Sequence, residues 1–167
     1  MEPSEHAFQK LIRSKYHQTS KYIIENLYFF SHDWESDMFI VKNNGYIYEI
    51  EIKISVSDFK ADLKKTKKHQ SLQSGNFIPN KFFYCIPEAI KDQVTLPKYA
   101  GLLTVSEFGS IKTAKEAPFL HKDKIEVESN IAQKLYRRWR TEVINNRQLK
   151  QDMKYLRESI GKPNLFN

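Results

Sequence analysis

The sequence predicts an α/β domain in which helices flank a mixed central sheet, followed by a long C-terminal helix. Two kinds of periodicity support this fold class. Apolar and polar side chains alternate over residues 46–54, as in a half-buried strand, whereas apolar side chains recur every three or four positions near both ends of the chain. Helical and strand patterns follow one another within residues 1–122, which predicts a single α/β unit, and residues 123–167 predict a helical extension.

The N-terminal segment predicts a helix and then a strand. Ser4 is a suitable N-cap, Glu5 lies in the first turn, where a carboxylate stabilises the helix dipole, and apolar residues follow at helical spacing as far as Tyr16. Residues 22–30 are rich in aromatic and β-branched types, which predicts a strand interrupted near Asn26.

The next two strands form a hairpin, and its register decides the chemistry. They are joined by Asn43-Asn44-Gly45, a segment of turn-forming residues. A two-residue turn would place Asp37 opposite Ile52, whereas a three-residue loop ending in a left-handed glycine would place Asp37 opposite Glu51. We favour the three-residue loop because it collects the apolar side chains of both strands on one face.

In this register the other face of the hairpin carries four carboxylates and a lysine. Carboxylates about 5 Å apart across strands repel each other unless positive charge lies between them. Mg²⁺ or Mn²⁺, which prefer oxygen ligands, would supply that charge. The alternative is a solvated, charged face of an edge hairpin, which needs no metal. The residues on this face are Glu35, Asp37, Glu49, Glu51 and Lys53.

A helix is predicted to begin at Ser55, directly after the hairpin. Its lysines would approach the candidate site, where they could hold a DNA backbone, or they could form a solvated face. Asp58 and Asp62 are expected to pair with these lysines, and His69 is expected at the surface. The candidate DNA-binding residues are Lys60, Lys64, Lys65, Lys67 and Lys68.

The remaining segments complete the sheet and add the long helix. Residues 81–86 form a continuous apolar run, typical of a central strand. Residues 88–94 predict a short helix, and residues 101–105 and 111–113 predict two further strands. Within the C-terminal helix, residues 149–160 have coiled-coil-like spacing and would either form a homodimer with a second copy or pack on the protein's own core.

Composition limits the classes of function. The chain has 167 residues, of which 40% are hydrophobic, enough for one domain with a core, and its net charge of +7 favours a polyanionic partner. An apolar run long enough to span a membrane and a secretory leader are both missing from the sequence, so we expect no membrane association. The single Cys85 excludes an internal disulfide, and we expect a cytoplasmic location.

The hairpin and the segment after it resemble a known nuclease signature. Asp37, followed after thirteen residues by Glu51-Ile52-Lys53, is similar to the signature of the PD-(D/E)XK nuclease superfamily, although Ser36 stands where that signature has proline. Residues 49–64 and 97–109 resemble the MmcB-like family of DNA repair-related proteins.

The resemblance covers about residues 37–120 and implies a restriction-endonuclease-like core that acts on DNA. It implies that Asp37, Glu51 and the main-chain carbonyl of Ile52 bind Mg²⁺ or Mn²⁺, and that Lys53 positions the attacking water or stabilises the transition state. The expected activity is metal-dependent endonuclease or exonuclease hydrolysis of phosphodiester bonds, in DNA repair, recombination or phage DNA processing.

Three further acidic residues are candidates for the site. Glu35 and Glu49 share the charged face, and Glu5 is included because superfamily members often carry an acidic residue on the first helix. Two other functions stay open at this point. One is a catalytically inactive, nucleic-acid-binding repair-accessory module with the same fold. The other is an interaction protein built around the C-terminal helix.

Overall fold

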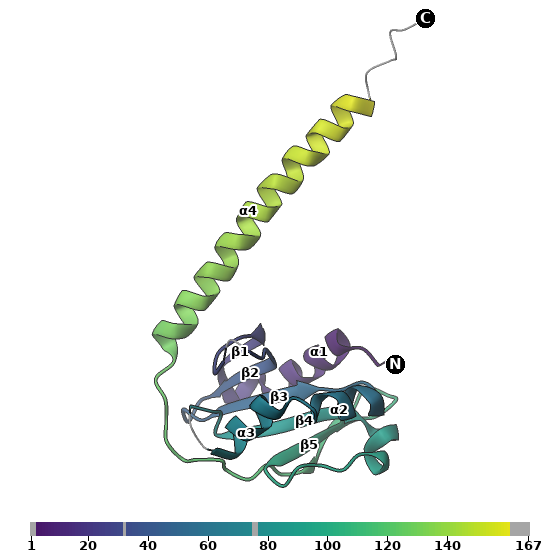
Figure 1. Cartoon of the computed structure of the whole chain (residues 1–167), viewed down its shortest axis with the longest axis vertical. Helices are drawn as coiled ribbons and strands as arrows, with labels where there is room; N and C mark the ends of the chain where they lie inside the picture. The colour runs from purple at the N-terminus through teal and green to yellow at the C-terminus, as the bar shows by residue number, and fades with distance from the viewer. Residues whose placement is uncertain (1–2, 32, 75–76, 161–167) are drawn as a thin grey trace, which may run out of the picture. The chain divides into compact units, whose positions relative to one another are not determined.

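The computed structural model describes residues 3–31, 33–74 and 77–160, with side chains as far as residue 155. The chain forms two compact units, Met1–Ile125 and Glu126–Asn167. The second unit contains one long helix, α4 (Glu128–Ile160) (Figure 1). Among the described residues, no helix has both the length and the apolar character needed to cross a membrane.

The first unit is built on a mixed sheet, whose six described strands lie side by side in chain order (Figure 1). The neighbours β3, β4 and β5 are parallel, and the other neighbouring strands are antiparallel. The predicted α/β class with a mixed sheet is therefore confirmed. The strands are β1 (Ser20–Leu27), β2 (Ser36–Lys42), β3 (Ile47–Ile52), β4 (Lys81–Pro87), β5 (Ala100–Val105) and β6 (Ile111–Lys115).

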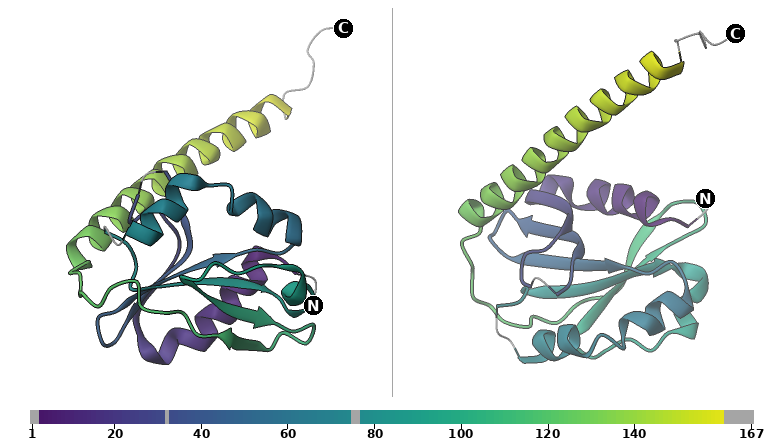
Figure 2. Two further views of the ribbon diagram at one scale, coloured as in Figure 1. Left: turned by 60° about the horizontal axis from the view of Figure 1, so that its bottom comes forward. Right: turned by 45° about the horizontal axis from the view of Figure 1, so that its top comes forward.

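Helices cover both faces of this sheet. Figure 2 shows α1 (Glu5–Tyr16) on one face, with α2 (Val56–Asp62) and α3 (Thr66–Ser74) on the other. Two short 3₁₀ helices, η1 (His17–Thr19) and η2 (Glu88–Gln93), lie in connections between these elements.

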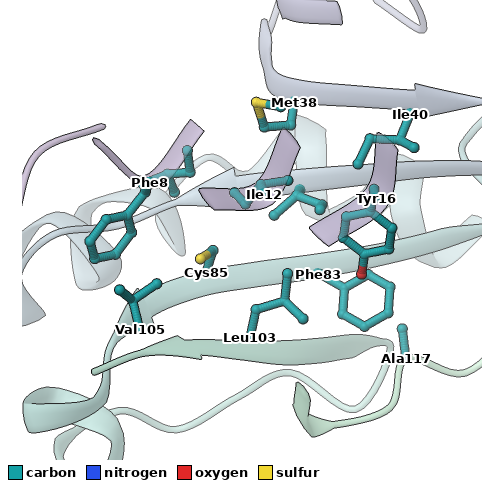
Figure 3. Close-up of a cluster of buried hydrophobic side chains, with 12 residues drawn as sticks. Phe8, Ile12, Tyr16, Met38, Ile40, Phe83, Cys85, Leu103, Val105 and Ala117 are labelled. Carbon is teal, nitrogen blue, oxygen red and sulfur yellow. The ribbon is translucent and has the colours of Figure 1, made fainter. Parts of the chain in front are cut away.

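The α1 side of the sheet holds a continuous apolar core. Figure 3 shows Phe8, Ile12 and Tyr16 of α1 facing the side chains that project from the strands. Apolar residues at helical spacing thus meet apolar residues at every second strand position, which is why this face excludes water. The strand residues of this core are Met38, Ile40, Ile50, Ile52, Phe83, Cys85, Leu103 and Val105.

The hairpin between β2 and β3 has the predicted register. Met38 pairs with Ile50, and the Lys42 amide donates to the Tyr46 carbonyl with 2.8 Å between N and O. Gly45 has a φ of +86°, the left-handed conformation that a three-residue loop requires. The three-residue loop is therefore confirmed, and Asp37 lies level with Glu51 across the two strands.

The prediction of one continuous helix through the lysine-rich segment is wrong. The chain instead ends α2 at Asp62 and begins α3 at Thr66. Near the break the Lys64 amide donates to the Ala61 carbonyl and the Lys65 amide donates to the Asp62 carbonyl, at 3.2 and 2.9 Å. These short-range hydrogen bonds tighten the last turn, so α3 starts in a new direction.

Candidate active site

The charged face of β3 is buried under α2 and α3. Glu49 and Glu51 pair with Phe82 and Tyr84 of β4, and these two aromatic side chains belong to the core beneath α2 and α3. Glu49 has no exposed surface, and Glu51 is 2% exposed. Because β3 lies between β2 and β4, the alternative of a solvated face on an edge hairpin is wrong.

Asp37 is tied to the end of β3. Its Oδ2 accepts a hydrogen bond from the Ile52 amide, with 2.6 Å between the two atoms. Burial and the neighbouring Glu51 charge raise the pKa of Asp37 to about 7, although Lys53 and this hydrogen bond lower it. The structure therefore brings Asp37, the first predicted carboxylate, next to Glu51, the second, and burial together with the Glu51 charge favours the protonated form of Asp37.

Lys53 contacts Glu51 as predicted for residues on one strand face. The Lys53 Nζ lies 2.8 Å from Glu51 Oε1, and both side chains are buried. Burial by itself lowers the pKa of Lys53, but the Glu51 and Asp37 charges outweigh it and raise the pKa above its ordinary value. Lys53 is therefore a permanent cation here, able to donate hydrogen bonds but not to accept a proton.

Lys68 completes the cluster. Its Nζ lies 2.5 Å from Glu51 Oε2 and 3.7 Å from Asp62 Oδ1, and its side chain is 2% exposed. The same nitrogen lies 5.2 Å from the centre of the Phe82 ring. The prediction that Lys68 belongs to a DNA-facing surface is wrong, because the break before α3 turns this residue inward.

A sequence signal for the inward position of Lys68 did exist. Leu72, four residues later on α3, is buried in the core, and residues four apart share a helix face. The burial of Leu72 therefore places Lys68 on the inner side of the helix.

A buried hydrogen-bond network fixes α3 in this position. The Tyr84 hydroxyl donates to Asp62 Oδ2 at 2.7 Å, and His69 Nε2 lies 2.8 Å from the Asp62 carbonyl oxygen. Because a carbonyl only accepts, Nε2 is the protonated nitrogen, which leaves Nδ1 to accept from the Tyr99 hydroxyl at 2.5 Å in the neutral ring. The expectation that His69 lies at the surface is wrong.

The other four lysines of the predicted DNA-binding set are exposed, and they come from different segments. Lys60 lies on α2, Lys64 and Lys65 in the break, and Lys67 on α3. Lys65 Nζ lies 3.0 Å from Asp62 Oδ1, which confirms the expected pairing of Asp62 with this lysine-rich segment. Lys64, Lys65 and Lys67 line one pocket together with Lys68, so these three lie beside the cluster, where solvent reaches them.

Glu49 has the weakest hydrogen bonding of the carboxylates in the cluster. Among the described residues, no hydrogen bond of ordinary geometry reaches either of its carboxyl oxygens, although the Ser36 side chain lies near enough to lower the pKa of Glu49. Burial raises the pKa of Glu49 to about 7; the Lys68 charge lowers this pKa, and the Glu51 charge raises it. A buried carboxyl with so little hydrogen bonding is costly, so its presence near the acidic groups of Glu51 and Asp62 indicates a functional rather than a stabilising role.

Glu35 and Glu5 lie at the margin of the cluster. Glu35 precedes β2 and is partly exposed, and within the described part of the chain it makes no ion pair with Lys53, which the predicted register placed on the same face. Glu5 is exposed on the first turn of α1, where its Oε1 lies 3.3 Å from Gln9 Nε2.

Gln9 was not predicted as a site residue. It is buried, and its Nε2 lies 2.9 Å from Asn26 Oδ1 and 3.4 Å from the Asp37 carbonyl oxygen. Asn26 itself has a φ of +54°, at the predicted interruption of the first strand. Gln9 thus fixes α1 and β1 against the backbone of Asp37, although its position among apolar residues of α1 gave no sign of this role.

The donor set suits a hard divalent cation. In the described residues no group of three or more Asp, Glu, His or Cys side chains is arranged to hold a metal ion. The predicted ligand set needs only two carboxylates, because its third member is a main-chain carbonyl. Burial is the main cause of the raised pKa values of Asp37 and Glu49, with the neighbouring Glu51 charge adding to it, and a bound divalent ion would favour the ionised form of both groups.

Comparison with known proteins shows no family for this chain. No protein-family model matches the chain, and no curated protein sequence matches it. Among solved structures, the chain is similar to a protein of unknown function from Silicibacter pomeroyi, with 19% sequence identity and a TM-score of 0.49. The likeness covers 86% of this chain and 84% of that one.

Proposed function

We propose that this protein is a Mg²⁺- or Mn²⁺-dependent deoxyribonuclease with a PD-(D/E)XK-like core. The observation that carries the proposal is the buried cluster around Glu51, which brings Asp37 and Lys53 together in the register that the nuclease signature requires. The net charge of +7 and the exposed lysines beside the cluster support DNA as the polyanionic substrate.

Asp37, Glu51 and the main-chain carbonyl of Ile52 would hold the ion. When bound, a divalent ion lowers the pKa of water and offsets negative charge that develops on a phosphate. Lys53 would donate a hydrogen bond to the attacking water or to a phosphate oxygen, since its raised pKa keeps it protonated.

Lys68 would act as a positioning residue. It holds Glu51 from the side opposite Lys53, and Asp62 holds Lys68. A cation on Glu51 would compete with the two ammonium groups for the same oxygens. The charge of Glu49 already acts on Lys68, and no ion pair occupies the Glu49 carboxylate among the described residues, so it is available as a second partner for Lys68.

DNA cleavage tests the proposal. Supercoiled, linear, single-stranded and branched DNA are incubated with Mg²⁺ or Mn²⁺ and with wild type, Asp37→Asn, Lys53→Met or the control Lys112→Met, which changes an exposed lysine of β6. We expect wild type and the control to cut at least one substrate, and the two site variants to cut it at least about 100-fold more slowly. Equal cleavage by all four proteins would contradict the site assignment.

A repair-accessory module is the second candidate, and one observation favours it. Both oxygens of Glu51 are already ion-paired, which is how a purely structural network without a metal would look. In that case all four proteins would bind DNA in a salt-sensitive manner, and none would cut it.

A further inference from the structure

Two adjoining pockets run along α3 beside the candidate active site. The first has a volume of about 450 Å³ and the second of about 310 Å³. They share three lining residues, Asp33, Trp34 and Lys67, so they form one continuous groove, which we call the α3 groove.

One end of the α3 groove is aromatic. Phe77 is 51% exposed, and its ring stacks on Phe29 with 5.9 Å between ring centres and 23° between the ring planes. Phe30, which also lines the groove, meets the same ring edge-on at 5.4 Å. An aromatic ring that is held by two others while half of its surface stays open is a stable platform for stacking.

The other end of the α3 groove is basic and ends at the buried Lys68. Four lysines line this end, and 81% of the Lys67 side chain is exposed. Lys68, the innermost of them, lies 2.5 Å from Glu51. A ligand along the groove would therefore extend from the aromatic platform to the exposed lysines beside Lys68. The lysines are Lys64, Lys65, Lys67 and Lys68.

Among the described residues that line the groove, Asp33 is the one acidic residue. Its Oδ2 lies 3.7 Å from Lys67 Nζ, and both side chains are mostly exposed. A phosphate oxygen that replaced Asp33 as the partner of Lys67 would keep the lysine paired. The Asp33 carboxylate would then repel the phosphate, so removing its charge should tighten the binding of an anionic ligand.

We propose that the α3 groove binds an unpaired DNA strand, with a base stacked on Phe77 and backbone phosphates held by the three exposed lysines Lys64, Lys65 and Lys67. This inference rests on the proposed function for the identity of the nucleic acid. In a duplex the bases stack on each other and show only their edges in the grooves, so the face of Phe77 can be used only by an unpaired base. The groove thus selects single-stranded or locally opened DNA as the substrate class.

Fluorescence anisotropy in EDTA tests the groove without cleavage. A labelled single-stranded oligonucleotide, the same sequence as a blunt duplex, and an abasic strand of equal length are titrated with each protein. Phe77→Leu removes the stacking ring but keeps apolar contact with Phe29 and Phe30. The matched controls are Phe108→Ala, at a ring that is 89% exposed in the turn after β5, and Lys112→Met on β6.

We expect wild type to bind the single strand at least about 10-fold more tightly than the duplex. Phe77→Leu and Lys67→Met should each weaken single-strand binding about 5- to 10-fold, and the controls should stay within about twofold. The Phe77→Leu effect should disappear with the abasic strand. Asp33→Asn should bind more tightly than wild type.

Equal affinity for strand and duplex, or groove variants that bind like the controls, would overturn the inference. Its failure can be told apart from failure of the proposed function. A protein that binds the single strand through Phe77 but cuts no DNA would contradict the nuclease and leave the groove standing. If wild type cuts DNA but Phe77→Leu and Lys67→Met bind the single strand as tightly as wild type, the groove is contradicted and the nuclease stands.

Discussion

Lys68 on α3 and Glu51 on β3 form a buried ion pair across seventeen residues of sequence, with 2.5 Å between Nζ and Oε2. With Lys53 on the other oxygen, Glu51 is held from both sides. The candidate site is therefore assembled from the hairpin and from α3, and the position of α3 determines how Glu51 is presented.

Replacing Lys68 by methionine should destabilise the protein strongly. Methionine keeps much of the apolar volume but removes the charge that partners Glu51 and Asp62, and losing one partner of a buried pair costs about 3–5 kcal/mol. Urea unfolding in EDTA measures the free energy of unfolding. Lys60→Met, at an exposed position of α2, is the matched control and should change it by less than about 0.5 kcal/mol. Similar values for both variants would show that the Lys68 pair contributes nothing.

Asp37→Asn should stabilise the metal-free protein at high pH. The folded-state pKa of Asp37 is about 7, against an ordinary value of 3.8, so the folded protein binds more protons than the unfolded chain between these values and loses stability as pH rises through them. Asparagine does not titrate and can still accept the Ile52 hydrogen bond. We expect the variant to be more stable than wild type by about 1–3 kcal/mol at pH 8, and the difference to shrink towards pH 4.

Urea denaturation of wild type and Asp37→Asn at a series of pH values measures whether wild type loses stability relative to the variant as pH rises. A wild type that gains stability relative to Asp37→Asn as pH rises would show that the Asp37 carboxylate is well solvated or well paired. Glu49→Gln should shift the same curve in the same direction, because burial raises the pKa of Glu49 from 4.5 to about 7 as well.

Glu5→Gln should leave divalent-ion binding almost unchanged. Glu5 is exposed, and its contact with the site runs through Gln9 rather than through Asp37 itself. Its charge acts on Asp37 over a distance that salt screens, so Mn²⁺ affinity should stay within about twofold of wild type. A large loss of Mn²⁺ affinity would show that Glu5 contributes to the metal site, the role for which the resemblance to the nuclease superfamily made it a candidate.

The long helix α4 should mediate self-association. Leu135, Trp139, Leu149 and Met153 recur along it and keep 39% to 58% of their surface exposed. Sedimentation of wild type should give a dimer, and the double variant Leu149→Glu with Met153→Glu should give a monomer. A monomeric wild type would favour the other sequence-based prediction, in which this stripe packs on the protein's own core.

The sequence predicted the hairpin but not the arrangement of α2 and α3, which cover its charged face. Strict alternation and the loop ending in Gly45 specify which residues of β2 and β3 face each other, so Asp37, Glu51 and Lys53 could be placed together from local pattern alone. The inward turn of Lys68 depends on a helix break that is fixed by long-range partners, namely His69 and Tyr84 bonded to Asp62. Lysine spacing on an assumed continuous helix cannot contain that information.

Isothermal titration of Mn²⁺ into wild type, Asp37→Asn and Glu51→Gln at pH 8 tests most directly whether the buried cluster is a metal site. Deprotonation of Asp37 and Glu49 should make binding stronger at pH 8 than at pH 6, with release of protons. We predict saturable binding to wild type and its loss in both variants, while all three proteins stay folded. Equal binding by the three proteins, or none by wild type, would contradict a metal-dependent nuclease built on Asp37 and Glu51.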